Sequence, residues 1–78
     1  MDITDLKKEQ EFVEKANMLD RQGQYRQAIE AYNQALGIVQ DDADVIFDMG
    51  QTLAKLGQVP EAMKCFETAT RMYISGPG

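Results

Sequence analysis

The stretch GQYRQAIEAYNQAL, residues 23–36, recurs 34 positions later as GQVPEAMKCFETAT, residues 57–70. The two copies share a glycine, an alanine, an aromatic residue and a second alanine at the same spacing. These residues are Gly23, Ala28, Tyr32 and Ala35 in the first copy and Gly57, Ala62, Phe66 and Ala69 in the second. Small residues at helical spacing let two helices approach closely. A repeat of this period predicts stacked helix-turn-helix hairpins and an all-α fold.

The composition favours one small folded domain of 78 residues, with 44% hydrophobic and 27% charged residues. Thirteen acidic residues against eight basic ones give a net charge of −5, and no basic run is present, so a nucleic-acid partner is not expected. No apolar run reaches the roughly 18 residues that span a bilayer, so we expect no membrane association. The single cysteine and the absence of a targeting segment predict a cytoplasmic protein.

Apolar spacing and capping residues predict four helices. Residues 1–8 extend the first helix backward, with Asp2 or Thr4 as its N-cap, and the helix ends before Gly23. The second helix spans residues 24 or 25 to 38 or 39, the third 43–56 after the capping residues Asp41 and Asp42, and the fourth about 60–73. The predicted organisation is an extension (1–8), a first repeat (9–42), a second repeat (43–75) and a flexible tail (76–78).

Both copies resemble tetratricopeptide repeats, a family whose unit is a 34-residue helix-turn-helix. The residues that carry the resemblance are Phe12, Ala16, Leu19, Ala28, Tyr32 and Ala35 in the first copy and Ile46, Met49, Gly50, Leu53, Ala62, Phe66 and Ala69 in the second. Lys15, on the inner stripe of the first helix, departs from the family pattern, as does Gln40 between the repeats. The resemblance implies a short right-handed α-solenoid that binds proteins and is not an enzyme.

Residues suited to catalysis or metal binding are few. The chain has no histidine, so Cys65 has no base to activate it and is interpreted as a packing residue in the place of Ala31. Four aspartates between residues 41 and 48 are explained by helix capping, since the glycine and closing glutamate of a calcium-binding loop are missing. Isolated glycines form no phosphate-binding loop. We therefore expect no cofactor and no metal.

The first helix of each repeat is expected to line the concave side of the stack, where this family usually binds ligands. The predicted peptide-binding groove comprises Gln10, Val13, Asn17, Arg21, Asp44, Phe47, Gln51 and Lys55. Amide groups here could meet a peptide backbone and apolar groups its side chains; the alternative is an ordinary variable surface. Val13 stands where chaperone-docking members of the family need a lysine, and Glu14 and Asp48 add negative charge. A neutral or basic peptide is therefore favoured over an acidic tail.

The fourth helix repeats the apolar stripe that the second presents to the following repeat. The predicted self-association face comprises Met63, Phe66, Thr70, Met72 and Tyr73. We expect Met63, Met72 and Tyr73 to face water in a monomer, which favours a homo-oligomer, a dimer above all, formed by two-fold pairing or hairpin exchange. Thr70 makes this stripe more polar than its counterpart, which has Leu36. Self-assembly is thus the alternative to a peptide-binding module.

Overall fold

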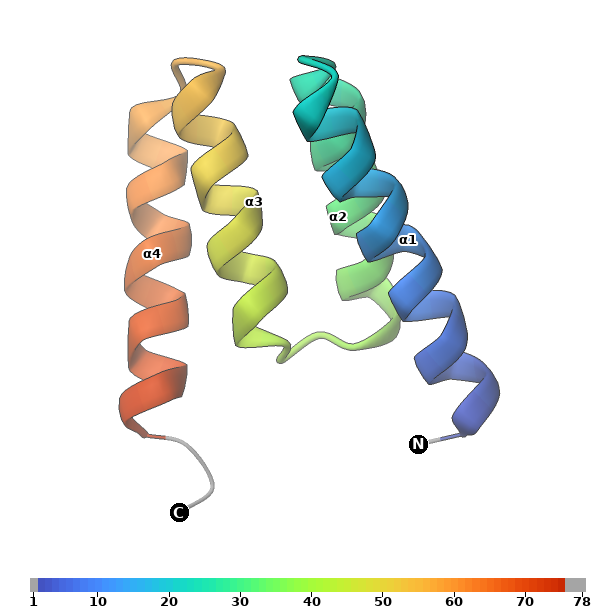
Figure 1. The fold of residues 1–78 in the computed structure, drawn as a ribbon. Coiled ribbons are helices and arrows are strands. Elements are labelled where there is room, and N and C mark those ends of the chain that lie inside the picture. The colour runs from blue at the N-terminus through green and yellow to red at the C-terminus, as the bar shows by residue number, and fades with distance from the viewer. Residues whose placement is uncertain (1, 76–78) are drawn as a thin grey trace.

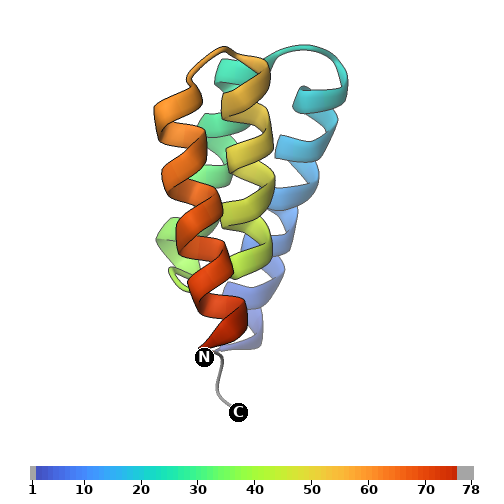
Figure 2. The same ribbon diagram turned by 90° about the vertical axis from the view of Figure 1, so that its left-hand side faces the viewer.

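The computed structural model describes residues 2–75 and has four helices, α1 (Ile3–Arg21), α2 (Tyr25–Ile38), α3 (Ala43–Lys55) and α4 (Val59–Ile74). They form two antiparallel hairpins, α1 with α2 and α3 with α4, which pack through α2 against α3 (Figures 1 and 2). No strand is found in the described part of the chain. The predicted all-α fold of stacked hairpins is confirmed, whereas the predicted tail, 76–78, lies outside the described residues.

The two hairpin turns have the same backbone conformation, as the repeat predicts. Gly23 and Gly57 have φ angles of 80° and 89°, which a residue with a Cβ rarely adopts. In each turn the glycine N–H donates to the carbonyl three residues back, and the next N–H donates to the carbonyl five residues back. These bonds satisfy the last carbonyl groups of α1 and α3. Glycine therefore ends both first helices at the same point of the repeat.

Side chains cap both first helices at their N-termini. Asp2 Oδ1 accepts a hydrogen bond from the Thr4 N–H, and Asp42 Oδ1 accepts one from the Val45 N–H, both at 3.4 Å. Of the two alternatives predicted for α1, Asp2 is the cap, and for α3 the cap is Asp42. The predicted extension at residues 3–8 belongs to α1, which is a single continuous helix. Capping thus sets where each hairpin begins.

The core lies where α2 meets α1 and α3. Its buried residues are Ala16, Ala28, Ala31, Tyr32, Ala35 and Val45, with Phe12, Val13, Leu19, Leu36 and Met49 packed around them. Only Val45 and Met49 come from α3, so the stacking of the two hairpins rests on a few apolar side chains. Small residues allow the close approach: a Cβ built on Gly50 would lie 3.0 Å from the Cβ of Cys65 and 2.8 Å from the Phe66 ring. Gly50 therefore lies at a close approach of α3 to α4.

Three assignments to the inner stripes need correction. Lys15 is exposed, although its spacing placed it on the inner stripe of α1, because α1 has α2 as its main neighbour and buries only one narrow face. Val45 and Thr52 of α3 are buried but lay outside the predicted stripe. Since α3 packs against both α2 and α4, its buried surface is wider than a single stripe. Neighbours, rather than helical period alone, determine these positions.

Among residues 2–75, no helix is both long enough and apolar enough to cross a membrane.

Candidate functional site

The predicted groove residues lie along α1 and α3, the first helix of each hairpin. Gln10, Arg21, Asp44, Gln51 and Lys55 are exposed, and Phe47 keeps 36% of its surface accessible. Val13 and Asn17 are half-buried. The polar positions are therefore accessible to a partner, while the apolar and amide positions of α1 are partly covered.

One end of this surface is hollowed where the middle of α1 meets the start of α3. A cavity of about 390 Å³ is lined by Glu9, Gln10, Val13, Glu14, Asp42, Asp44, Val45 and Asp48. We refer to it as the carboxyl cavity, because five of these eight residues are acidic. It brings together three of the predicted groove residues, Gln10, Val13 and Asp44. Its volume falls within the range of about 300 to 1,000 Å³ that is usual for ligand pockets.

Two predicted groove residues contact their own hairpin partner instead of pointing away from it. The Tyr32 hydroxyl of α2 donates a 2.6 Å hydrogen bond to Asn17 Oδ1. The Phe47 ring packs against Phe66 of α4, with the ring centroids 5.3 Å apart and tilted by 51°. The prediction that this face turns wholly away from the partner helix is therefore wrong at Asn17 and Phe47. The long side chains of Tyr32 and Phe47 reach across their hairpins, which spacing alone does not reveal.

At the opposite end, near the hairpin turns, charged groups join α1 to α3. Lys55 Nζ lies 2.8 Å from Asp20 Oδ2, and the Thr52 hydroxyl donates a 2.8 Å bond to Asp20 Oδ1. Burial would raise the pKa of Asp20, but the hydrogen bonds from Lys55 and Thr52 outweigh it and lower that pKa. The Lys55 ammonium also lies 5.9 Å from the centre of the Tyr25 ring. Lys55 is thus engaged within the protein.

Glu9 is the residue of this surface that sequence reasoning missed. Its side chain is only 7% exposed, and its Oε2 atom has no hydrogen-bond partner among the described residues. Hydrogen bonding to the neighbouring Asp42 carboxyl raises the pKa of Glu9 to about 7, and burial and the Asp42 charge add to this rise. Burial, followed by the charges of Asp44, Asp42 and Asp20, also raises the pKa of Asp48. The acidic residues of the carboxyl cavity therefore oppose one another's ionisation.

The predicted self-association face is largely exposed on α4. Met63 is 60% exposed and Tyr73 55%, Thr70 is exposed, and Phe66 is half-buried. The prediction that Met72 faces water is wrong: it is half-buried, since it lies one turn after the buried Ala69. A hollow of about 420 Å³ lies over this face, lined by Met63, Phe66, Glu67, Thr70 and Arg71.

A hydrogen bond links the predicted groove to the predicted self-association face. The Tyr73 hydroxyl at the end of α4 donates to Asp44 Oδ1 at the start of α3. Hydrogen bonding to Asp44 raises the pKa of Tyr73 to about 12. The two predicted surfaces therefore meet at this hydrogen bond.

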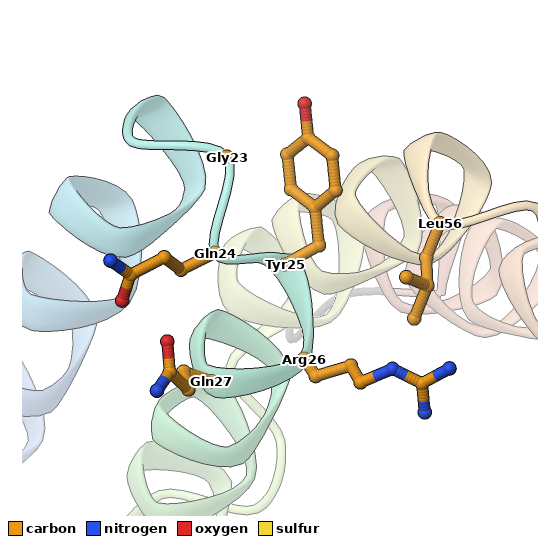
Figure 3. Close-up of a pocket in the computed structure, with 6 residues that line it drawn as sticks. All are labelled: Gly23, Gln24, Tyr25, Arg26, Gln27 and Leu56. Carbon is orange, nitrogen blue, oxygen red and sulfur yellow. The ribbon is translucent and has the colours of Figure 1, made fainter.

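A third hollow, of about 400 Å³, lies at the hairpin-turn end between the start of α2 and the end of α3 (Figure 3). It is lined by Gly23, Gln24, Tyr25, Arg26, Gln27 and Leu56. The side chains of Gln24 and Arg26 extend in opposite directions, and Tyr25 points out of the fold (Figure 3). Because these polar groups do not converge, we assign no ligand to this hollow.

The described residues offer few groups for covalent or metal chemistry. Cys65 is half-buried on α4, beside the close approach of Gly50, and burial raises the pKa of its thiol. A thiol with a raised pKa is a poor nucleophile, consistent with its packing role. Within residues 2–75, no group of three or more histidine, cysteine, aspartate or glutamate side chains is arranged to hold a metal ion.

Comparison with known proteins identifies the repeat. The family model described as tetratricopeptide repeat matches residues 21–73, which is more than half of the chain. Searches against curated protein sequences and against solved structures gave no match. The matched region contains both glycine turns and the α2, α3 and α4 helices that pack in adjacent pairs. The chain therefore belongs to the tetratricopeptide-repeat family.

Proposed function

We propose that this chain is a protein-binding module that holds a peptide segment of its partner on the surface formed by α1 and α3. Its family indicates a protein–protein interaction module, and members of the family are generally scaffolds without enzymatic activity. The observation that carries the proposal is the carboxyl cavity, which is hollowed into this surface and includes Gln10, Val13 and Asp44.

The chemistry of the surface suits a peptide. Gln10 and Gln51 are exposed amides that can both donate to and accept from a peptide backbone. Val13 of α1 and the exposed part of Phe47 of α3 supply apolar contact. The surface is acidic at the carboxyl cavity, while Lys55 at the other end is paired with Asp20. These features favour a neutral or basic peptide.

The test is to select binding peptides from a displayed random library and to map the best one by amide chemical shifts. We expect the largest shifts at Gln10, Val13, Asp44 and Gln51. Gln10→Ala should weaken binding severalfold, whereas Gln34→Ala on the exposed side of α2 should not. Shifts confined to the outer faces of α2 and α4 would show that the peptide binds elsewhere and would overturn the proposal.

Self-association is the second candidate function, favoured by the hollow over α4 with its exposed Met63. Glu67 and Arg71, one turn apart, flank this apolar hollow. Two copies of α4 packed antiparallel about a two-fold axis would place Glu67 of each copy opposite Arg71 of the other. The apolar side chains would then be covered and both charges paired.

Sedimentation or light scattering across a concentration series tests this pairing. We expect Met63→Glu combined with Tyr73→Glu to give monomers at concentrations where the parent chain dimerises. Glu67→Arg and Arg71→Glu should each weaken the dimer, because like charges then meet, and the double variant should restore it. Two-fold pairing is excluded if the parent chain is monomeric. It is also excluded if the charge-swapped double variant dimerises no more strongly than either single variant.

A further inference from the structure

The carboxyl cavity has an excess of negative charge with no cation to balance it. Glu9 and Glu14 from α1, together with Asp42, Asp44 and Asp48 from the start of α3, line it, and none of its lining residues is basic. The ion pair found within residues 2–75, between Lys55 and Asp20, lies at the other end of α3. The like charges that line this one cavity repel one another, so the cavity favours a positively charged occupant.

Glu9 is an independent indication of a ligand at this place. It is more than nine-tenths buried, it lines the cavity, and its Oε2 atom has no hydrogen-bond partner among the described residues. Buried carboxyl oxygens in folded proteins nearly always have a partner, because leaving one unpaired costs free energy. A donor group that reaches this buried oxygen from the cavity would supply the missing bond.

We propose that the carboxyl cavity binds the guanidinium group of an arginine side chain carried by the partner peptide. This inference rests on the proposed function and names the residue that the peptide must contain. A guanidinium group is planar and carries five N–H donors, so it can bond to Glu9 and Asp42 at once. Val13 and Val45, which also line the cavity, would contact the methylene groups of the arginine stem.

Two other cations fit the cavity less well. A divalent metal ion needs several ligands converging on one point, and the described residues contain no such group of three or more. A lysine ammonium is a compact point charge that is strongly hydrated and cannot bond in bidentate fashion to two carboxyl groups in one plane. Arginine is therefore the occupant that this donor set favours.

Proton binding should compete with arginine. Glu9 has a pKa of about 7, and the groups that face it are Asp42, Asp44 and Asp48 from α3 and the loop before it, and Glu14 on its own helix. An arriving guanidinium favours the ionised carboxyl groups and so releases the Glu9 proton. Binding should accordingly be tighter at pH 8 than at pH 5.5.

The test uses Nα-acetyl-arginine methylamide as the probe and the citrulline analogue, which has the same shape but no charge, as its control. Amide chemical shifts of Val13, Asp42 and Val45 and the carboxyl carbon shift of Glu9 report occupancy. We expect saturable shifts with millimolar affinity for the arginine probe and binding about tenfold weaker or less for citrulline. Equal binding of the two probes, or no saturable shift with arginine, would overturn the inference.

Charge-matched variants separate this site from general attraction to an acidic protein. Glu9→Gln should weaken arginine binding by about fivefold or more and remove most of its pH dependence. Glu11→Gln removes the same charge two residues away on the exposed side of α1, outside the cavity, and should change the affinity less than twofold. If Glu11→Gln weakens binding as much as Glu9→Gln, the attraction is non-specific and the inference fails.

The library-selected peptide distinguishes failure of this inference from failure of the proposed function. If a peptide binds to the surface of α1 and α3 and replacing its arginine by citrulline has no effect, the function stands and the inference is wrong. If the arginine probe binds in the cavity but no peptide can be selected, the inference stands and the proposed function is wrong. Both fail if neither ligand shifts the residues of the cavity.

Discussion

The two hairpins are built from the same repeat but differ in what covers them. Tyr32 of α2 is 2% exposed because α3 lies over it, whereas its counterpart Phe66 on α4 is only half-buried. Ile29 is likewise half-buried and its counterpart Met63 is 60% exposed. The repeat pattern sets which residues face inward within a hairpin, but a neighbouring hairpin decides how much of the outer face is buried.

The hairpins also join their helices by different interactions, although both interactions use the equivalent residues Tyr32 and Phe66. The first uses a hydrogen bond from Tyr32 to Asn17, and the second uses the contact between the rings of Phe66 and Phe47. The second hairpin brings its helices close together at Gly50, whose counterpart is Ala16. One is therefore held by a directional polar bond and the other by tight apolar packing.

The largest expected effect compares alanine positions that correspond in the two hairpins. Ala28 is fully buried in the core cluster under α3, whereas Ala62, also buried, lies in the hairpin with the uncovered outer face. We expect Ala28→Leu to lower the free energy of unfolding by about 2 to 3 kcal/mol and Ala62→Leu by about 1 kcal/mol, because overpacking is relieved more easily beside an open face. Urea unfolding measures both. An unchanged stability for Ala62→Leu would contradict the packing described for α3 and α4.

The second prediction concerns Glu9, whose counterpart in the second repeat is the neutral Ala43. The folded-state pKa of Glu9 is about 7, above its ordinary value of 4.5, so the folded protein holds a proton that the unfolded chain has released between these values. The stabilising contribution of this proton is complete below pH 4.5 and is lost as the pH rises through 7. We expect a loss of about 1 to 2 kcal/mol.

Thermal unfolding at pH 5 and pH 8, followed by circular dichroism, measures this loss. Glu9→Gln should remove most of the pH dependence and should be more stable than the parent chain at pH 8. Both pH values lie above the acidic range in which Asp20 becomes protonated, since the pKa of Asp20 is lowered. Protonation of Asp20 would reduce the stability only at lower pH. A parent chain that is equally stable at both values would show that Glu9 does not hold the proton.

The third prediction compares alanine substitutions at two glycines that lie within helices. A Cβ on Gly50 would lie 2.8 Å from the Phe66 ring, whereas a Cβ on Gly37 has nothing within 4 Å. Gly50→Ala should therefore destabilise the chain by about 1 kcal/mol, the overpacking cost being partly offset by better helix propensity. Gly37→Ala should stabilise it by about 0.5 to 1 kcal/mol. If both variants gain stability, the approach of α3 to α4 is looser than the structure shows.

The sequence predicts the fold well because its main determinants are local and repeated. Gly23 and Gly57 mark both turns, Asp2 and Asp42 mark the starts of the first helices, and the shared alanines mark the close contacts. Each of these features depends on residues within one hairpin. The four helices could therefore be predicted with only small errors at their ends.

The candidate site could be predicted only in part, because it depends on contacts between hairpins. Glu9 has no acidic counterpart in the second repeat, and nothing in its spacing shows that the loop before α3 brings Asp42 beside it. Similarly, the Tyr32 hydroxyl reaches Asn17, so this predicted groove residue contacts its own hairpin partner. The signal that could have found Glu9 is the clustering of acidic residues at the start of α3, which was interpreted only as helix capping.

The smallest expected effect comes from making the first hairpin resemble the second. Tyr32→Phe removes the donor to Asn17 while keeping the ring that fills the core. It should lower the free energy of unfolding by only about 0.5 to 1 kcal/mol, because water can reach the half-buried Asn17 and replace the lost bond. A double-mutant cycle with Asn17→Ala isolates the bond itself. If Tyr32→Phe costs as much in the Asn17→Ala background as in the parent chain, the hydrogen bond contributes nothing.

The reverse change, Phe66→Tyr, should bring no gain, because Phe47 already packs against that ring. A clear stabilisation by Phe66→Tyr would show that the polar and apolar ways of joining the helices are interchangeable and that the difference between the hairpins has no energetic basis.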